Sequence, residues 1–314
     1  KIPMLEPADS EEARLFAKRA FQLSEEYDTP VFLKLCTRIS HSQSLVEVGQ
    51  REDLPPRPYV KDIAKYVMVP GNARPRPPIV EERPRRLTAY AETTDLNREE
   101  LGEDTSLGII TSSTCYQYAR EVFGEKASIL KLGLVNPLPR QKILDFAAKV
   151  DRLLVLEELD PVIEEHCRNL GLTVQGKDAL PLIGEFSQGL VAEKLGKTPK
   201  PWVALDEAVP PRPPVLCAGC PHRGLFYTLA KHKVTVLGDI GCYTLAAYEP
   251  LYAIETCECM GASVSSIHGF NKALGQASEG KTVAVLGDST FMHSGMTGLA
   301  NIAYNQSNST VIIL

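Results

Sequence analysis

Residues 106–200 alternate between short apolar runs and segments with helical spacing. Three apolar runs are typical of strands that are buried on both faces: 107–110, 128–132 and 153–156. A segment with apolar residues at helical spacing follows each run: 112–123, 140–150 and 161–170. This strand–helix repeat predicts a parallel sheet with right-handed crossovers, flanked by helices.

The same alternation returns in residues 215–314. Apolar runs predict buried strands at 234–237, 283–286 and 310–314. Helices are predicted at 225–231, from about Cys259 to Ala277, and after Thr290, where Met296, Leu299, Ala300 and Ala303 share one face. We therefore expect a multidomain α/β protein with parallel sheets in both blocks.

The N-terminal segment is too short to form a domain. Asp9 and Glu12 have the spacing of a capping box for an amphipathic helix, and residues 31–35 predict a buried strand. One helix and one strand cannot bury a core by themselves. We expect residues 1–52 to be the C-terminal tail of a larger domain.

Two proline-rich stretches separate these blocks. Residues 53–105 combine proline with arginine, and residues 201–214 contain the run Pro210-Pro211-Arg212-Pro213-Pro214. Proline lacks a backbone N–H and fixes φ. The first stretch therefore predicts an extended crossing with little regular structure, and the second predicts a stiff linker.

Composition narrows the class of protein. The chain has 314 residues, of which 44% are hydrophobic and 23% are charged, as in a globular protein of two or three domains. A net charge of −5 argues against nucleic acid as a partner. No apolar run is long enough to cross a membrane and no signal peptide opens the chain, so we expect a cytoplasmic protein. Because Lys1 is not an initiator Met, we expect an internal fragment of a longer polypeptide.

The stretch 282–314 carries the clearest chemical signal. A predicted buried strand ends at Gly287-Asp288-Ser289-Thr290, and a helix follows. A turn and a helix N-terminus offer free N–H groups to phosphate, and Asp288 can offer a carboxylate oxygen to Mg²⁺. The alternative is a strand–turn–helix unit in which Asp288 only caps the helix and no cofactor binds.

The cysteines suggest a second kind of chemistry. Five of the eight crowd into one part of the chain: Cys217, Cys220, Cys242, Cys257 and Cys259. A CxxC in a Gly/Pro turn can hold a soft metal centre, although the spacing does not separate zinc from an iron–sulfur cluster. The rival interpretation is a redox dithiol.

Five motifs occur in a characteristic order: LKLGLVNPLP (130–139), CAGCPHRG (217–224), GDIGCYTL (238–245), CMGAS (259–263) and GDSTFMHSGMTGL (287–299). Together they resemble the alpha subunits of indolepyruvate:ferredoxin oxidoreductase, within the thiamine-diphosphate-dependent 2-oxoacid:ferredoxin oxidoreductase superfamily. The resemblance covers essentially the whole chain.

The resemblance implies a fold built from pieces of thiamine-diphosphate-binding domains. Residues 1–52 would end the pyrimidine-binding domain, and residues 106–200 would be a transketolase-C-terminal-like domain. Residues 215–314 would be a diphosphate-binding domain truncated at its C-terminal end. The activating glutamate, the second Mg²⁺ ligand and most of the [4Fe-4S] clusters would lie outside this chain, which alone should not turn over.

The resemblance also implies the residues of the site. Asp288 would hold Mg²⁺ on the diphosphate, and Met260 would be an apolar wedge under the cofactor. The remaining cofactor-binding residues would be Gly241, Cys242, Gly261, Gly287, Ser289 and Thr290. Three cysteine sulfurs would ligate a cluster and should converge near the cofactor: Cys217, Cys220 and Cys242. No catalytic side chain is assigned within the chain.

The implied activity is oxidative decarboxylation of an aryl 2-oxoacid to acyl-CoA. Ferredoxin would accept the electrons, coenzyme A would accept the acyl group, and a beta subunit of the same enzyme would be the partner chain. Two alternatives remain open at this point. One is a non-oxidative thiamine-diphosphate decarboxylase or synthase, and the other is a non-enzymatic α/β module stapled by zinc.

Overall fold

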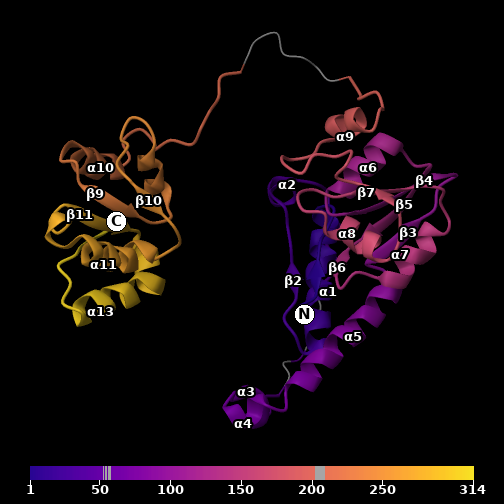
Figure 1. Ribbon diagram of the computed structural model, residues 1–314, viewed down its shortest axis with the longest axis horizontal. Coiled ribbons are helices and arrows are strands. Elements are labelled where there is room, and N and C mark those ends of the chain that lie inside the picture. Colours follow the sequence, from indigo (N-terminus) through magenta and orange to yellow (C-terminus); the bar gives the residue numbers. More distant parts are fainter. Residues whose placement is uncertain (52, 54, 56–57, 202–208) are drawn as a thin grey trace. The chain divides into compact units, whose positions relative to one another are not determined.

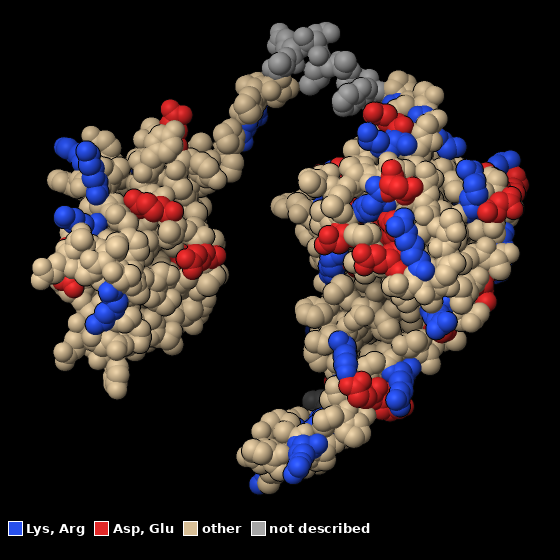
Figure 2. All heavy atoms as spheres, in the orientation of Figure 1, with Lys and Arg blue, Asp and Glu red and all other residues tan. Residues whose placement is uncertain are grey.

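The computed structural model describes residues 1–314 except 52, 54, 56–57 and 202–208 (Figure 1). The chain divides into two compact units, residues 1–203 and 204–314. Each unit is described by itself. Figure 2 shows acidic and basic side chains interspersed over the face in view. Within the described residues, no helix is both long and apolar enough to cross a membrane.

The main sheet of the first unit has the spatial order β3-β5-β4-β7-β8. Its strands are β3 (Asn97–Glu100), β4 (Asp104–Ser112), β5 (Ala127–Leu132), β7 (Leu153–Leu156) and β8 (Val174–Gln175). All neighbouring pairs are parallel except β3 with β5. The α/β fold with parallel sheets that the sequence predicted is therefore confirmed.

Helices cover both faces of this sheet (Figure 1). They are α6 (Cys115–Phe123), α7 (Arg140–Ala147), α8 (Val162–Asn169) and α9 (Gln188–Lys194). Successive strand residues point to opposite faces: Ile109 packs in the cluster with α6 and α9, and Ile110 packs in the cluster with α7 and α8. Both side chains are fully buried, which explains why these strands read as continuous apolar runs.

The prediction of an irregular crossing at 53–105 is wrong. This stretch contains α3 (Ile63–Tyr66), α4 (Pro70–Ala73), the 17-residue α5 (Pro77–Thr93) and β3. Pro77 and Pro78 occupy the first turn of α5, where a missing N–H costs nothing. Leu87 and Ala91 are buried against the N-terminal segment, so tertiary packing outweighs the cost of Pro84 inside the helix.

The N-terminal segment forms a small sheet of order β2-β1-β6. Its elements are β1 (Met4–Leu5), α1 (Ser10–Tyr27), β2 (Phe32–Leu33), α2 (Thr37–His41) and β6 (Leu134–Asn136). The predicted cap is confirmed: Asp9 accepts the N–H of Glu12 at 2.8 Å, and Glu12 reaches back to the N–H of Ala8 at 2.7 Å. The assignment of residues 1–52 to a pyrimidine-binding domain stays a prediction.

A buried ion pair joins α1 to the main sheet. Lys131 on β5 is fully buried, and its Nζ donates to Oε2 of Glu12 at 2.5 Å. Burial by itself would raise the pKa of Glu12, but the Lys131 ammonium outweighs it and holds the pKa below the ordinary 4.5. Burial lowers the pKa of Lys131 despite this partner. Lys131 therefore depends on Glu12 for its compensation, whereas Glu12 also accepts from Nη1 of Arg98 at 2.7 Å.

The second unit is a parallel sheet of order β10-β9-β11-β12. Its strands are β9 (Thr235–Gly238), β10 (Thr256–Cys257), β11 (Thr282–Leu286) and β12 (Thr310–Ile313). Helix α10 (His222–Lys231) packs on one face, while α11 (Ala262–Leu274) and α13 (Met296–Tyr304) pack on the other. Val285 and Leu286 point to opposite clusters, so this sheet is also covered on both faces.

Glu12→Gln should destabilise the first unit by about 3–5 kcal/mol, because Lys131 would remain buried without its anion. The double variant Glu12→Gln/Lys131→Met should recover most of that loss. Since the pKa of Glu12 is lower in the folded state, the stability it contributes is present above pH 4.5 and is lost as the pH falls through the folded value. Urea unfolding between pH 3 and pH 7 measures both effects. A single variant as stable as the parent would contradict the account.

Candidate functional site

The strand order of the second unit contains a switch point beside β9. From β9 the chain goes to β10 on one side, and then to β11 on the other side of β9. In open parallel sheets, ligands bind outside the carboxyl ends of the strands where the strand order reverses in this way. The loops at this switch point follow β9 and β11 and begin at Asp239 and Gly287.

The loop after β11 presents a carboxylate at the start of a helix. Gly287 is the N-cap of α12 (Asp288–Thr290), which continues through a π-helical turn at Phe291–Gly295 into α13. Asp288 is exposed, and its Oδ1 accepts the N–H of Ser289 at 2.6 Å. Ser289 and Thr290 lie within the first helical turn, after the loop itself. This helix N-terminus directs its positive dipole end to the switch point.

A buried carboxylate that sequence reasoning missed holds the loop after β9. Asp239 is fully buried, and both of its oxygens accept the N–H of Gly261 at 2.9 Å. Oδ2 also accepts the backbone N–H of Ser263 at 3.3 Å and its hydroxyl at 2.8 Å. Asp239 therefore fixes the N-terminus of α11 to the end of β9. An Asp directly after an apolar strand was the available signal, since the same pattern had singled out Asp288.

The turn before α11 fits tightly against the helix that follows Asp288. Gly261 has φ of +88°, and a Cβ there would lie 2.4 Å from Oγ of Ser294. That hydroxyl donates to the carbonyl of Met260 at 3.0 Å. Only glycine fits this position, because both the backbone conformation and the close approach exclude a side chain. The neighbouring Met260 side chain is 46% exposed.

Tyr243 connects the loops after β9 and β11. Its hydroxyl donates to the carbonyl of Ile240 at 3.0 Å and accepts the N–H of Gly287 at 3.1 Å. Burial raises the pKa of Tyr243 above its ordinary value of 10.0. The phenol therefore stays protonated at neutral pH, where it can donate one of these hydrogen bonds and accept the other. The His222 ring meets the Tyr243 ring edge-on, with centroids 5.9 Å apart. Sequence reasoning missed Tyr243, because no local pattern marks a contact across 44 residues.

The structure brings the predicted cofactor-binding residues to one edge of the sheet. They lie in loops after three neighbouring parallel strands, β9, β10 and β11. These residues are Gly241, Cys242, Met260, Gly261, Gly287, Asp288, Ser289 and Thr290. Their roles toward a cofactor stay predictions.

The prediction that three cysteine sulfurs converge is wrong. Among the residues that the structure describes, no three His, Cys, Asp or Glu side chains form a group that could hold a metal ion. The CxxC forms a local turn, in which the N–H of Cys220 donates to the carbonyl of Cys217 at 3.1 Å. Cys220 packs against the apolar cluster beside α10, whereas Cys242 is exposed on the switch-point loop. The role of Cys217, Cys220 and Cys242 as cluster ligands stays a prediction.

The arrangement suits a diphosphate that is held through a divalent cation. The helix that begins at Asp288 has its N-terminus at the switch point, where its positive dipole end favours an anion. The exposed carboxylate of Asp288 supplies the hard oxygen that Mg²⁺ prefers. By fold and site, this unit is a diphosphate-binding α/β domain.

Comparison with known proteins gives the family. Residues 239–314 match the thiamine pyrophosphate enzyme, C-terminal TPP binding domain. The whole chain is 35% identical to the indolepyruvate oxidoreductase subunit IorA of Pyrococcus horikoshii, of which it covers 55%. It is also 35% identical to IorA of Archaeoglobus fulgidus, of which it covers 54%. The chain is thus a homologue of the IorA subunits over its full length, and it contains a thiamine-pyrophosphate-binding domain.

The chain spans about half the length of the curated relatives it matches. Among solved structures, the 2-oxoglutarate:ferredoxin oxidoreductase from Magnetococcus marinus resembles it with a TM-score of 0.40 and 12% identity. That likeness covers 62% of this chain and 41% of the other.

Asp239→Asn should destabilise the second unit by about 3 kcal/mol, because an amide nitrogen would face N–H donors that now meet a carboxylate oxygen. Thermal unfolding of the intact protein measures the change. Glu279→Gln, at an exposed position before β11, is the control and should leave the midpoint unchanged. Equal midpoints for the Asp239 variant and the control would show that Asp239 does not anchor α11.

Proposed function

We propose that this chain is part of a thiamine-diphosphate-dependent oxidoreductase of the indolepyruvate type. The enzyme decarboxylates an aryl 2-oxoacid oxidatively, passes the electrons to ferredoxin and transfers the acyl group to coenzyme A. The observation that carries this proposal is the Asp288 carboxylate at a helix N-terminus on the switch point. The match to the TPP binding domain and the likeness to IorA subunits support it.

Three loops of the second unit hold the diphosphate end of the cofactor. Asp288 would hold the Mg²⁺ that accompanies the diphosphate, and the positive dipole end of the helix that begins at Asp288 would favour the diphosphate charge. Gly241 and Cys242 line the side of the diphosphate opposite Asp288. When bound, thiamine diphosphate supplies a thiazolium ring that accepts the electron pair released as CO₂ leaves.

Met260 supports the cofactor from below. Its side chain is 46% exposed at the carboxyl edge, and the Ser294 hydroxyl fixes its backbone carbonyl. A thioether fits irregular apolar surfaces. As an apolar wedge, Met260 would hold the bound cofactor in the conformation that its chemistry needs, which is a proximity effect.

The first unit and other chains of the assembly supply the rest of the active enzyme. Residues 1–52 belong to the pyrimidine-binding domain, and residues 106–200 form most of the transketolase-C-terminal-like domain, whose sheet also includes β3 from the preceding segment. A beta subunit completes the enzyme. The [4Fe-4S] clusters that carry single electrons to ferredoxin lie mostly outside this chain.

Asp288→Ala should abolish Mg²⁺-dependent binding of thiamine diphosphate, because the diphosphate loses the cation that offsets its charge. Calorimetric titration of the intact protein with thiamine diphosphate, with and without Mg²⁺, measures this. Glu279→Ala removes an exposed carboxylate from the start of β11, at the opposite edge of the sheet, and should bind the cofactor like the parent. Unchanged affinity in Asp288→Ala would refute the assignment.

Met260→Ala should retain thiamine diphosphate but slow the exchange of its C2 proton by about tenfold or more, because the bent conformation is no longer enforced. Hydrogen–deuterium exchange at C2, followed by NMR in the intact protein, measures the rate. Met292→Ala, another exposed methionine nearby in sequence to the Asp288 turn, is the matched control. Equal exchange rates in the Met260 and Met292 variants would show that Met260 does not act as a wedge under the cofactor.

A further inference from the structure

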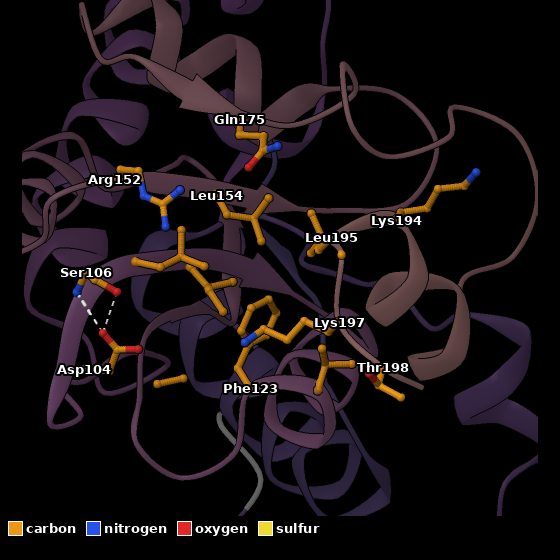
Figure 3. Close-up of a pocket in the computed structure, with 15 residues that line it drawn as sticks. Asp104, Ser106, Phe123, Arg152, Leu154, Gln175, Lys194, Leu195, Lys197 and Thr198 are labelled. Atoms are coloured by element: carbon orange, nitrogen blue, oxygen red, sulfur yellow. Dashed lines mark hydrogen bonds between the residues drawn. The ribbon is translucent and has the colours of Figure 1, made fainter. Parts of the chain in front are cut away.

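The first unit has a cavity at the amino edge of its main sheet, outside the site described above. Its volume is about 630 Å³, which is within the range of small-molecule sites. Its apolar surface comes from four half-buried side chains that pack over the core of this unit: Leu107, Val122, Phe123 and Leu195. Figure 3 shows Phe123 and Leu195 together with the polar side chains of the cavity.

A bulge in β4 opens this cavity. Asp104 pairs with Ala127 and Gly108 pairs with Ser128, so residues 105–107 have no counterpart on β5. Such a bulge bends the strand and is a common feature beside functional sites. The bulge also fixes the start of β7, because the N–H of Gly108 donates to the carbonyl of Arg152 at 2.8 Å. Arg152 therefore projects from a firm backbone position.

A second cation reaches the cavity from the C-terminus of α9. Gly196 has φ of +67°, and the N–H of Lys197 donates to the carbonyl of Ala192 at 2.8 Å. These features form a Schellman motif, which sets the direction of the chain after the helix. The Lys197 ammonium lies 5.1 Å from the centroid of the Phe123 ring. Figure 3 shows Arg152 and Lys197 reaching into the cavity from different sides, while Lys194 extends away from it.

The cations in the cavity exceed its anions. Asp104 is the one carboxylate among the lining residues, and its Oδ1 accepts the N–H and the hydroxyl of Ser106 at 3.0 and 2.6 Å. These hydrogen bonds, aided by Lys197 and Arg152, hold the pKa of Asp104 below its usual value. Within the part of the chain that the structure describes, neither Arg152 nor Lys197 forms a salt bridge. Two cations beside apolar side chains leave a place for one anionic head group.

We propose that this cavity binds an organic acid that has an apolar body and a single carboxylate. The carboxylate lies between Arg152 and Lys197, and the body covers the half-buried Phe123 and Leu195. A cation at each side holds the head group, while the apolar side chains exclude acids without an apolar body. The proposal does not rest on the thiamine-diphosphate function, because the cavity belongs to the other unit of the chain.

Calorimetric titration of the intact protein with 1-naphthaleneacetate tests the proposal. Arg152→Gln and Lys197→Gln should each weaken binding by at least about tenfold, equivalent to about 1.4 kcal/mol. Lys194→Gln is the matched control and should bind like the parent, since its ammonium points away from the cavity. Acetate, which has only the head group, and 1-naphthalenemethanol, which has only the body, should both bind far more weakly. Thermal unfolding of each variant checks that the fold is retained.

Three results would overturn the proposal. The first is no binding of 1-naphthaleneacetate by the parent protein. The second is equal affinity in Arg152→Gln and in Lys194→Gln, which would place the acid elsewhere, including the thiamine-diphosphate site. The third is acetate binding as tightly as 1-naphthaleneacetate, which would show a simple anion site that makes no use of the apolar side chains.

Discussion

The buried carboxylate of Asp239 is the constraint on which the carboxyl edge of the second unit depends. A fully buried anion is tolerated only when hydrogen bonds compensate it, and here the donors come from Gly261 and Ser263 at the start of α11. One interaction thereby ties the end of β9 to the N-terminus of a helix that follows a different strand. The Met260 turn and its contact with Ser294 are placed as a consequence.

Tyr243 fixes the position of the loop that carries Asp288. Its hydroxyl contacts the backbone on both sides of the switch point, so the loops after β9 and β11 are held at a fixed separation. Loops that are ordered before a ligand arrives lose less conformational entropy when it binds. Asp288 itself remains exposed at the centre of this framework. The unit thus combines a rigid backbone with one carboxylate that is free to accept a metal ion.

Sequence reasoning succeeded where the signal was local. The strands around Ile109 and Val285 were predictable because a strand buried on both faces must be apolar throughout, and Asp288 stood out because strand, Gly-Asp and helix follow directly. The roles of Asp239 and Tyr243 were not predicted, because they depend on partners that are 22 and 44 residues away in the sequence. Helix α5 was missed because its prolines suggested irregular structure, while packing decided the outcome. Cys242 was wrongly joined to the CxxC because sequence spacing does not fix distance in space.

The location of the metal tests the central claim most directly. The intact protein would be loaded with Mn²⁺ and thiamine diphosphate, and its structure determined in that complex. The account predicts a metal ion about 2.1 Å from a carboxylate oxygen of Asp288, with the diphosphate between the N-terminus of α11 and Gly287. A diphosphate bound at any other edge of the sheet, or a metal ion without Asp288 among its ligands, would contradict it.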